Sequence, residues 1–410
     1  MRLEVDSDPA ELGFDPERFA RLDHRLGRYV DEGLLPGWSV LVSRHGRIAH
    51  LSTCGQRDME AGQPVELDTL WRIFSMTKPI TSVAAMILYE EGAFELTDPI
   101  SKWLPQFTDM RVYRRGTSQA PATEAALSPI RIWHLLTHTA GLTYGFHHAH
   151  PVDAMYRSAG FEWGQPPGMD LAQCCAVWAQ LPLVFQPGTE WNYSVATDVL
   201  GRLVEVVSGK SLDEFFADRI FTPLGMTDTG FWVDEDKADR LAALYIPERG
   251  TRKAIRQDGL GKVANHKPDF LSGGGGLIST AADYHRFTQM LARGGELDGV
   301  RILGSRTLAH MTRNHLPGGA DLEQVGRPLY AESSFDGVGF GLGFSILMDP
   351  AAAKSLAAPG EFAWGGAAST TFWVDPVEDI TALFFTQLLP SSTHPLRTQL
   401  RQLVYQALVD

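Results

Sequence analysis

The chain has 410 residues, of which 44% are hydrophobic and 21% are charged, the composition of a globular protein long enough for two structural lobes. Its formal net charge of −13 argues against nucleic acid or an anionic membrane as the main partner. No stretch approaches the roughly 18 continuous apolar residues that a membrane span needs, so we expect none.

The first residues and the cysteines predict a cytoplasmic location. Residues 1–26 contain recurrent Asp and Glu and no apolar core after a basic start, unlike a secretory signal peptide. The three cysteines are Cys54, Cys174 and Cys175, and adjacent cysteines lie too close together for an ordinary disulfide. Because these thiols make no disulfide framework, a reducing cytoplasm fits best.

Strand-like patterns lie at both ends of the chain. Residues 37–51 alternate apolar and small polar side chains around a turn sequence. Similar runs return only at 340–348, 370–374 and 380–388, and their short connections favour antiparallel neighbours. The closing segment, 396–409, has its apolar residues at helical spacing.

The middle of the chain has helical patterns. Residues 75–91 carry apolar side chains at helical spacing, and Gly92 can end that helix in the left-handed conformation. A second helix is expected over 198–208, after which Ser211 and Glu214 have the spacing of a capping box. These patterns predict an α+β fold, in which an antiparallel sheet built from both chain ends is flanked by helices and carries a mostly helical insert.

Ser75 and Lys78 form the strongest local signal for chemistry. They stand three residues apart at the expected start of a helix, so both side chains lie on one face. The serine hydroxyl would then lie at the positive end of the helix, where a developing anion is favoured. A lysine kept neutral by burial can accept the serine proton, as histidine does in other serine enzymes. This S-x-x-K sequence occurs once in the chain and indicates a serine nucleophile.

Tyr193 is the second candidate, on the segment just before the expected 198–208 helix. A tyrosine on such a loop can reach the same serine and act as a general base where nearby positive charge favours its phenolate. Taken alone, an ordinary half-buried tyrosine is the simpler interpretation.

The sequence Trp364-Gly365-Gly366-Ala367 is the third candidate, with two glycines that are expected to precede a strand. Glycines there let a substrate approach the backbone, whose N–H groups can bind an oxyanion. The alternative interpretation is a glycine bulge in an edge strand.

Together these motifs resemble the serine β-lactamase and penicillin-binding protein superfamily. Within it the chain is most similar to the class C β-lactamase-like esterases, called family VIII carboxylesterases. The resemblance runs from about Phe19 to the C-terminus. It includes four further segments: WHLLTHTAGL at 133–142, QPG at 186–188, PLGM at 223–226 and GGGGLISTAAD at 273–283.

The resemblance implies roles for particular residues. Ser75 would be the nucleophile, Lys78 and Tyr193 its acid–base partners, and the N–H groups of Ser75 and Ala367 the oxyanion hole. Substrate contacts are expected from five residues: Tyr144, Val195, Trp364, Gly365 and Gly366. No metal or cofactor is expected.

The resemblance also implies a β-lactamase-like fold. We expect a sheet domain formed by residues 1–74 and 270–410, and a mostly helical domain formed by residues 75–269. The active site would lie at the interface between the two domains.

Two positions depart from the β-lactamases of this group. Those enzymes have Asn two places after the tyrosine, where this chain has Val195. They have Lys-Thr-Gly or His-Thr-Gly where this chain has Trp364-Gly365-Gly366. The Asn amide and the basic residue help to hold the amide and carboxylate of a β-lactam. Their loss disfavours β-lactam hydrolysis, and the esterases of the family commonly have the Trp-Gly-Gly version.

Other hydrolase classes fit less well. No serine has glycines at both positions two residues away, as the G-x-S-x-G motif of α/β-hydrolases requires. A dense histidine group lacks H-E-x-x-H and lacks a carboxylate at ligand spacing, so we interpret it as rim or structural side chains rather than a metal site. Its members are His134, His138, His147, His148 and His150.

We therefore expect a cofactor-free serine carboxylesterase that hydrolyses short-chain esters through a Ser75 acyl-enzyme, with weak or no β-lactamase activity. A small-molecule ester is the expected partner. The alternatives are an acyltransferase that uses the same acyl-enzyme, a β-lactamase or D-alanyl-D-alanine peptidase, and an inactive ligand-binding module. An exported peptidase or lactamase would carry an export signal, and an inactive module would be expected to lose Ser75, Lys78 or Tyr193.

Overall fold

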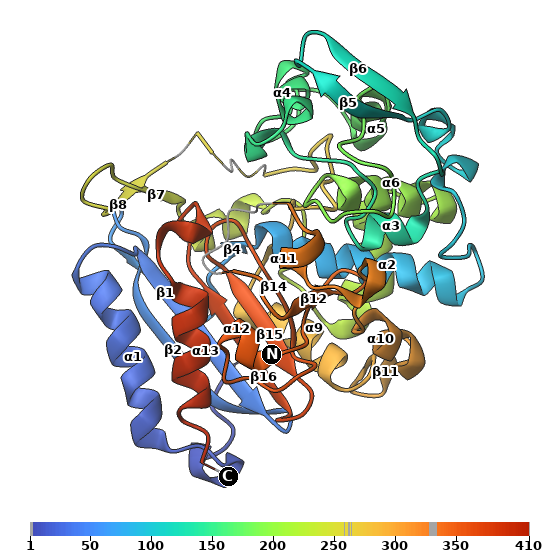
Figure 1. Cartoon of the computed structure of the whole chain (residues 1–410). Coiled ribbons are helices and arrows are strands. Elements are labelled where there is room, and N and C mark those ends of the chain that lie inside the picture. The colour runs from blue at the N-terminus through green and yellow to red at the C-terminus, as the bar shows by residue number, and fades with distance from the viewer. Residues whose placement is uncertain (1–2, 258, 261–262, 264, 328–333, 410) are drawn as a thin grey trace.

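The fold is given by a computed structural model, which describes residues 3–257, 259–260, 263, 265–327 and 334–409 (Figure 1). Its main element is an eight-stranded antiparallel sheet with the strand order β12-β13-β14-β15-β16-β1-β2-β3. The strands of this sheet are β1 (Gly37–Arg44), β2 (Arg47–Asp58), β3 (Gln63–Pro64), β12 (Val338–Phe340), β13 (Ser345–Leu347), β14 (Phe362–Gly365), β15 (Thr371–Asp375) and β16 (Ile380–Phe385).

Four small two-stranded sheets and the helices complete the described structure. The small sheets pair β4 (Trp71–Arg72) with β9 (Ile278–Ser279), β5 (Arg111–Gly116) with β6 (Pro121–Ala125), β7 (Tyr245–Pro247) with β8 (Ala254–Arg256), and β10 (Glu296–Leu297) with β11 (Val300–Arg301). The α-helices are α1 (Pro16–Asp31), α2 (Thr77–Glu90), α3 (Ile132–Leu136), α4 (Pro151–Ser158), α5 (Leu171–Trp178), α6 (Ala196–Ser208), α7 (Leu212–Phe216), α8 (Thr222–Leu224), α9 (Ala281–Ala292), α10 (Ser305–Met311), α11 (Leu322–Val325), α12 (Pro350–Ala353) and α13 (Leu396–Tyr405).

The two chain ends meet in the middle of the large sheet. β1 pairs with β16 from Ser39 opposite Phe385 to Arg44 opposite Ile380, and on its other side β1 pairs with β2. Every residue of β1 and of β16 is buried, as expected of central strands that are covered on both faces. This arrangement confirms the predicted sheet built from both ends of the chain.

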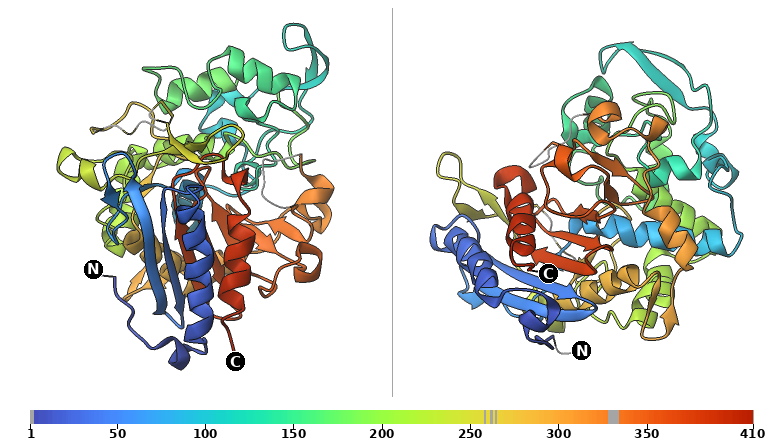
Figure 2. Two further views of the ribbon diagram at one scale, coloured as in Figure 1. Left: turned by 90° about the vertical axis from the view of Figure 1, so that its left-hand side faces the viewer. Right: turned by 60° about the horizontal axis from the view of Figure 1, so that its bottom comes forward.

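Helices cover both faces of the sheet (Figure 2). On one face α1 and α13 lie side by side, and their leucines pack with Trp38 and Trp373 in one core cluster. On the other face α9 sets Tyr284 against Phe372 of β15, with ring centroids 5.3 Å apart. The helices α3, α5 and α6 lie beyond α2 (Figure 1), and the predicted α+β architecture of an antiparallel sheet flanked by helices is confirmed.

The helix that follows the predicted nucleophile begins at Thr77 rather than at Ser75, carries Lys78 and is buried almost throughout. Twelve of the fourteen residues of α2, from Thr77 to Leu88, are buried, because α2 lies between the sheet and α6. Gly92 follows the helix with φ 73°, as predicted, and Ser211 and Glu214 form the predicted capping box. A buried helix of this kind holds a side chain at its first turn in a fixed place.

One predicted strand is wrong. The run at 340–348 is divided into β12 and β13, and the two strands pair with each other through a turn at 341–344. Gly343 has φ 100° there, and a Cβ on it would lie 2.2 Å from Ser82 Oγ on α2. The turn therefore depends on glycine for both its conformation and its close approach to α2.

None of the helices in the described part of the chain combines the length and apolar character that a bilayer crossing requires. All three cysteines are free thiols, with Cys174 and Cys175 buried.

Candidate active site

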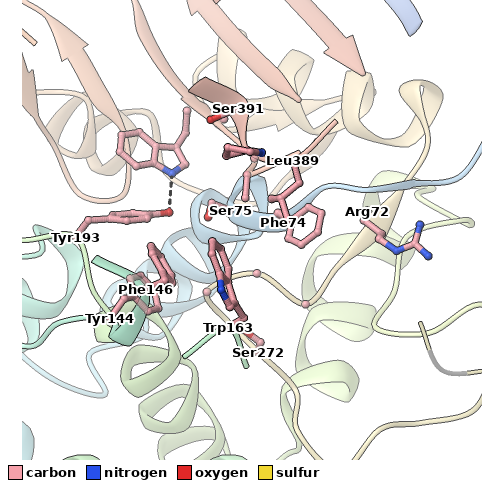
Figure 3. A pocket seen from close by; sticks show the side chains of 18 of the residues that line it. Arg72, Phe74, Ser75, Tyr144, Phe146, Trp163, Tyr193, Ser272, Leu389 and Ser391 are labelled. Atoms are coloured by element: carbon pink, nitrogen blue, oxygen red, sulfur yellow. Dashed lines mark hydrogen bonds between the residues drawn. The ribbon is translucent and has the colours of Figure 1, made fainter. Parts of the chain in front are cut away.

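A cavity of about 760 Å³ opens where α2 begins, between the end of β14 and the helical insert (Figure 3). Eight of the nine residues singled out in the sequence line it, and the ninth, Lys78, lies beneath it with 2% of its surface exposed. The eight are Ser75, Tyr144, Tyr193, Val195, Trp364, Gly365, Gly366 and Ala367. Residues from distant parts of the chain are therefore brought to one place.

Ser75 stands on a strained turn ahead of α2. Phe74 has φ 44°, a left-handed conformation that is costly for a bulky residue and is typical of functional turns. The turn is held on either side, because Ile73 N–H donates to Leu277 O at 3.1 Å and Met76 N–H donates to Ile73 O at 3.0 Å. Phe74 carries no sequence signal for this conformation, so sequence analysis missed it.

Lys78 lies one helical turn below Ser75. Its Nζ donates to Ser75 Oγ at 3.2 Å and to the Gly274 carbonyl at 2.7 Å. The same Nζ lies 4.4 Å from the centre of the Tyr193 ring. Nζ thus lies between a backbone carbonyl, an aromatic face and the serine hydroxyl, with which it is in direct contact.

Asp198 is a second residue that sequence analysis missed. Its Oδ1 accepts from Ser272 Oγ at 2.6 Å and from Gly274 N–H at 3.0 Å, so it holds the residue whose carbonyl binds Lys78. Burial raises the pKa of Asp198, while the hydrogen bond from Ser272 and the charge of Lys78 act in the opposite direction.

The glycine run at 273–276 makes this close packing possible. A Cβ on Gly274 would lie 2.5 Å from Asp198 Oδ2, and a Cβ on Gly273 would lie 2.9 Å from the Thr197 carbonyl oxygen. Asp198 has the sequence pattern of an ordinary first-turn acid of α6, which is why only its contacts distinguish it.

Tyr193 enters the cavity from the segment before α6. Its hydroxyl accepts a hydrogen bond from Trp364 Nε1 at 3.3 Å, and Figure 3 shows that hydroxyl pointing toward Ser75. Its carbonyl oxygen lies 2.6 Å from His147 Nε2, and its ring packs 5.0 Å from the His138 ring. The tyrosine is therefore fixed at both its backbone and its hydroxyl.

His138 has the structural role that its sequence context suggested. It is buried, and its Nδ1 and Nε2 lie 3.2 Å from Ser194 Oγ and 3.5 Å from Thr197 Oγ1. Burial lowers the pKa of His138 well below its usual range, and the charge of Lys78 adds to this effect. A neutral imidazole follows, which packs the Tyr193 segment against α6.

The glycines after Trp364 precede a strand, as expected, but a turn separates them from it, and they do not form an edge bulge. Trp364 and Gly365 end β14, which lies between β13 and β15, and the next residues form the turn into β15. Gly366 N–H donates to Thr370 O at 2.8 Å, closing that turn. A Cβ on Gly366 would lie 2.5 Å from Ile73 O, so the turn packs against the segment that leads to Ser75.

Arg397 of α13, which also lines the cavity, holds the same turn. Its Nη2 donates to Gly366 O at 2.7 Å and to Thr370 O at 3.1 Å, the two carbonyls that flank Ala367 and its neighbours. A Cβ on Gly365 would lie 2.5 Å from the Arg397 guanidinium carbon. The conformation of this turn thus depends on both a glycine and an arginine that are far apart in the sequence.

Tyr144 and Val195 form part of the cavity wall next to these groups. The Tyr144 ring lies 5.4 Å from the Tyr193 ring and 5.4 Å from Lys78 Nζ. Burial raises the pKa of Tyr144 well above its usual range, and the charge of Asp198 raises it further, so its hydroxyl stays protonated. Val195 adds an apolar surface with no hydrogen-bonding side chain.

The histidines near the cavity have separate surroundings. His147 and His150 line a small cavity of about 140 Å³ with Asp153 and Arg327, while His148 Nε2 lies 3.3 Å from Glu162 Oε1. Within the described residues, no three His, Cys, Asp or Glu side chains are gathered as metal ligands would be.

Comparison with known proteins identifies the family of the chain. The family model described as Beta-lactamase matches residues 22–406. The chain belongs to the beta-lactamase family. A protein of Mycobacterium tuberculosis is 39% identical over 88% of each chain, and Esterase EstB of Burkholderia gladioli is 32% identical over 97% of this chain and 98% of its own.

A solved structure supports the same assignment at the level of fold. EstCE1, a hydrolase with promiscuous acyltransferase activity, superposes with a TM-score of 0.79 at 28% identity and covers 95% of this chain and 99% of its own. The prediction of a β-lactamase-like serine hydrolase is therefore confirmed in family and in fold.

Proposed function

We propose that this beta-lactamase family member is a serine carboxylesterase of the family VIII type, with Ser75 as its nucleophile. The observation that carries the proposal is the 3.2 Å contact between Lys78 Nζ and Ser75 Oγ at the floor of a largely apolar cavity. The similarity to Esterase EstB over nearly the whole chain points to the same chemistry.

Acylation follows from the positions of these groups. Tyr193 and Lys78 share the removal of the Ser75 proton, and Oγ attacks the ester carbonyl carbon. The oxyanion that forms would be bound by the N–H groups of Ser75 and Ala367. The C–O bond to the alcohol then breaks, and the alcohol leaves with a proton returned by Tyr193.

Deacylation reverses these roles with a different nucleophile. A water molecule gives its proton to the Tyr193–Lys78 pair and attacks the acyl carbon, and the bond to Ser75 Oγ breaks as Oγ regains a proton. An alcohol in place of water would make the reaction an acyl transfer. EstCE1 combines both activities, so added alcohol should be tested as a competing acceptor.

Esters should be preferred to β-lactams by roughly a hundredfold or more in kcat/KM. Val195 offers no hydrogen bond to the amide of a β-lactam, and Trp364 Nε1 already donates to Tyr193. Three arginines also line the cavity, but Arg72 donates to Ala242 O, Arg397 donates to two backbone carbonyls, and Arg401 pairs with Glu361 at 2.9 Å. Among the described residues, the guanidinium groups that line the cavity are thus already engaged by protein groups, which disfavours binding of a β-lactam carboxylate.

The measurement is a rate panel on one preparation, with a short-chain nitrophenyl ester, a chromogenic cephalosporin and a D-alanyl-D-alanine peptide. Comparable kcat/KM values for the ester and the cephalosporin would reject the esterase assignment in favour of a β-lactamase. If esters are preferred but Trp364→Ala leaves the ratio unchanged, the assigned cause of the preference is wrong.

Replacing Arg397 by methionine should lower kcat by about tenfold or more and leave KM nearly unchanged. Arg397 holds the turn that contains Ala367, and the Ala367 N–H is proposed to bind the oxyanion of the transition state rather than the bound ester. Methionine keeps an unbranched apolar side chain but removes both donors to the 366–370 turn. Steady-state kinetics with one nitrophenyl ester give both constants, and thermal unfolding shows whether the whole fold has been weakened instead. An unchanged kcat would mean that the turn keeps its shape without Arg397.

We also propose that the enzyme acts in the cytoplasm on a small molecule, without nucleic acid as a partner. Three free thiols and a net charge of −13 support this proposal. Burial raises the pKa of both Cys174 and Cys175, so these thiols are poor nucleophiles and suit a structural role.

A further inference from the structure

Three aromatic rings continue the cavity away from the catalytic groups. Tyr144, Phe146 and Trp163, here called the aromatic platform, all line the cavity and gather below Ser75 and Tyr193 in Figure 3. Tyr144 and Phe146 are stacked with centroids 4.6 Å apart at 20°, and Phe146 and Trp163 with centroids 5.1 Å apart at 13°. The rings form an offset column that starts beside Tyr193 and ends at Trp163.

The outer end of the column is exposed. Trp163 has 57% of its surface accessible, and in the described part of the chain only Phe146 stacks on its indole. More than half of Trp163 is therefore accessible, and its indole can contact a molecule in the cavity. Large aromatic surface that is left open in a pocket is typical of a binding site, because covering it removes apolar area from water.

Contacts around the platform hold it in place before any ligand binds. Arg157 Nη1 donates to Gly145 O at 2.5 Å, and a Cβ on Gly145 would lie only 2.1 Å from Phe161 O, so the two loops are in direct contact. His148 and Glu162 pair at 3.3 Å across the same loops. A preformed site of this kind loses little ordering entropy when it binds a flat group.

The size of the cavity agrees with a bulky substrate. Its volume of about 760 Å³ falls within the 300–1,000 Å³ of pockets that bury most of a drug-sized ligand. A short-chain ester alone would fill only a small part of it. Figure 3 shows Leu389 and Ser391 on the opposite side of Ser75 from the platform, so the cavity has room on both sides of the nucleophile.

We propose that the natural substrate is an ester whose alcohol part carries a planar aromatic ring system that stacks on the aromatic platform. The proposal rests on the esterase function proposed above, in which Tyr193 returns a proton to the leaving alcohol. The alcohol oxygen must then lie near the Tyr193 hydroxyl, and the Tyr144 ring, which begins the platform, is 5.4 Å from the Tyr193 ring. The acyl part extends the other way, toward Leu389 and Ser391.

The test compares alcohols that differ only in being aromatic or saturated. 2-Naphthylmethyl butanoate should be hydrolysed with a kcat/KM about three- to tenfold above that of its decahydronaphthyl counterpart, and Trp163→Leu should bring the ratio close to one. Trp232→Leu is the matched control, because Trp232 is half-buried, lies outside the cavity lining and should leave the ratio as in the unaltered enzyme. A ratio near one in the unaltered enzyme, or one that Trp163→Leu does not change, overturns the proposal.

A binding measurement separates failure of this proposal from failure of the esterase assignment. Calorimetry of the Ser75→Ala variant with the same two esters should show tighter binding of the naphthyl compound. If neither ester is hydrolysed by the unaltered enzyme but this binding preference is found, the esterase assignment fails and the aromatic site stands. If ethyl butanoate is hydrolysed and no aromatic preference appears in rate or binding, the esterase assignment stands and the aromatic site fails.

Discussion

Replacing Ser75 by alanine should lower kcat for a nitrophenyl ester by on the order of 10⁴-fold or more, as loss of the nucleophile does in other serine enzymes. Ser75 Oγ is in hydrogen-bond contact with Lys78 Nζ and lines the cavity, whereas the substituted side chain has no atom that can form an acyl bond. An alkyl phosphonate should add covalently to the same hydroxyl, and peptide mass mapping identifies the modified residue.

Ser82→Ala is the matched control for this experiment. Ser82 is buried in α2, the helix that follows Ser75, but it faces Gly343 and lies outside the cavity lining. Its alanine variant should keep its activity and should still react with the phosphonate. An adduct on a serine other than Ser75, or near-normal turnover by Ser75→Ala, would reject the assignment of the nucleophile.

Periodic patterns predicted the parts of the fold that depend on burial. β1 and β2, the helix after Ser75 and the closing helix α13 are each marked by apolar residues at the spacing of their element. The pairing of β1 with β16 could be expected only because strand-like runs are confined to the chain ends. These elements are local or repetitive, so a single sequence contains the information for them.

Features set by close approach of distant segments could not be predicted. The contact of Asp198 with Gly274 joins residues that are 76 positions apart in the sequence. The positive φ of Phe74 is a strained conformation that its residue type does not predict. The split of the 340–348 run arises because Gly343 lies against Ser82. Trp163 has no sequence feature that marks it as part of the cavity, and its stacking on Phe146 is seen only in the structure.

Replacing Tyr193 by phenylalanine should lower kcat by about 10²- to 10⁴-fold, the usual contribution of a general acid–base group. The change removes only the hydroxyl, which points toward Ser75 and accepts from Trp364 Nε1. The ring contacts with His138, Tyr144 and Lys78 should remain, so near-ultraviolet circular dichroism should be preserved. Steady-state kinetics over a range of pH measure the loss and show whether the ionisation that limits the rate has disappeared.

Trp364→Phe separates two possible causes of the fall in kcat that is expected for Tyr193→Phe. It removes the hydrogen bond to Tyr193 while leaving the hydroxyl, so a much smaller fall in kcat than in Tyr193→Phe identifies proton transfer as the function of the hydroxyl. Equal losses in the two variants would instead assign the effect to the lost hydrogen bond. If Tyr193→Phe keeps most of its activity, Tyr193 is a packing residue and another group must accept the serine proton.

Lys78→Arg tests directly whether Lys78 accepts the serine proton. Arginine keeps the positive charge but cannot release its proton near neutral pH, so activity should collapse by a similar factor if a neutral lysine takes part in proton transfer. If the lysine acts only as a fixed charge beside Ser75 and the Tyr193 ring, a measurable part of the activity should survive. Because the side chain is 2% exposed, the larger guanidinium must also fit beside Gly274 O, and thermal unfolding of the variant shows whether it does. A folded Lys78→Arg variant with most of its activity would leave Tyr193 as the base and Lys78 as its electrostatic support.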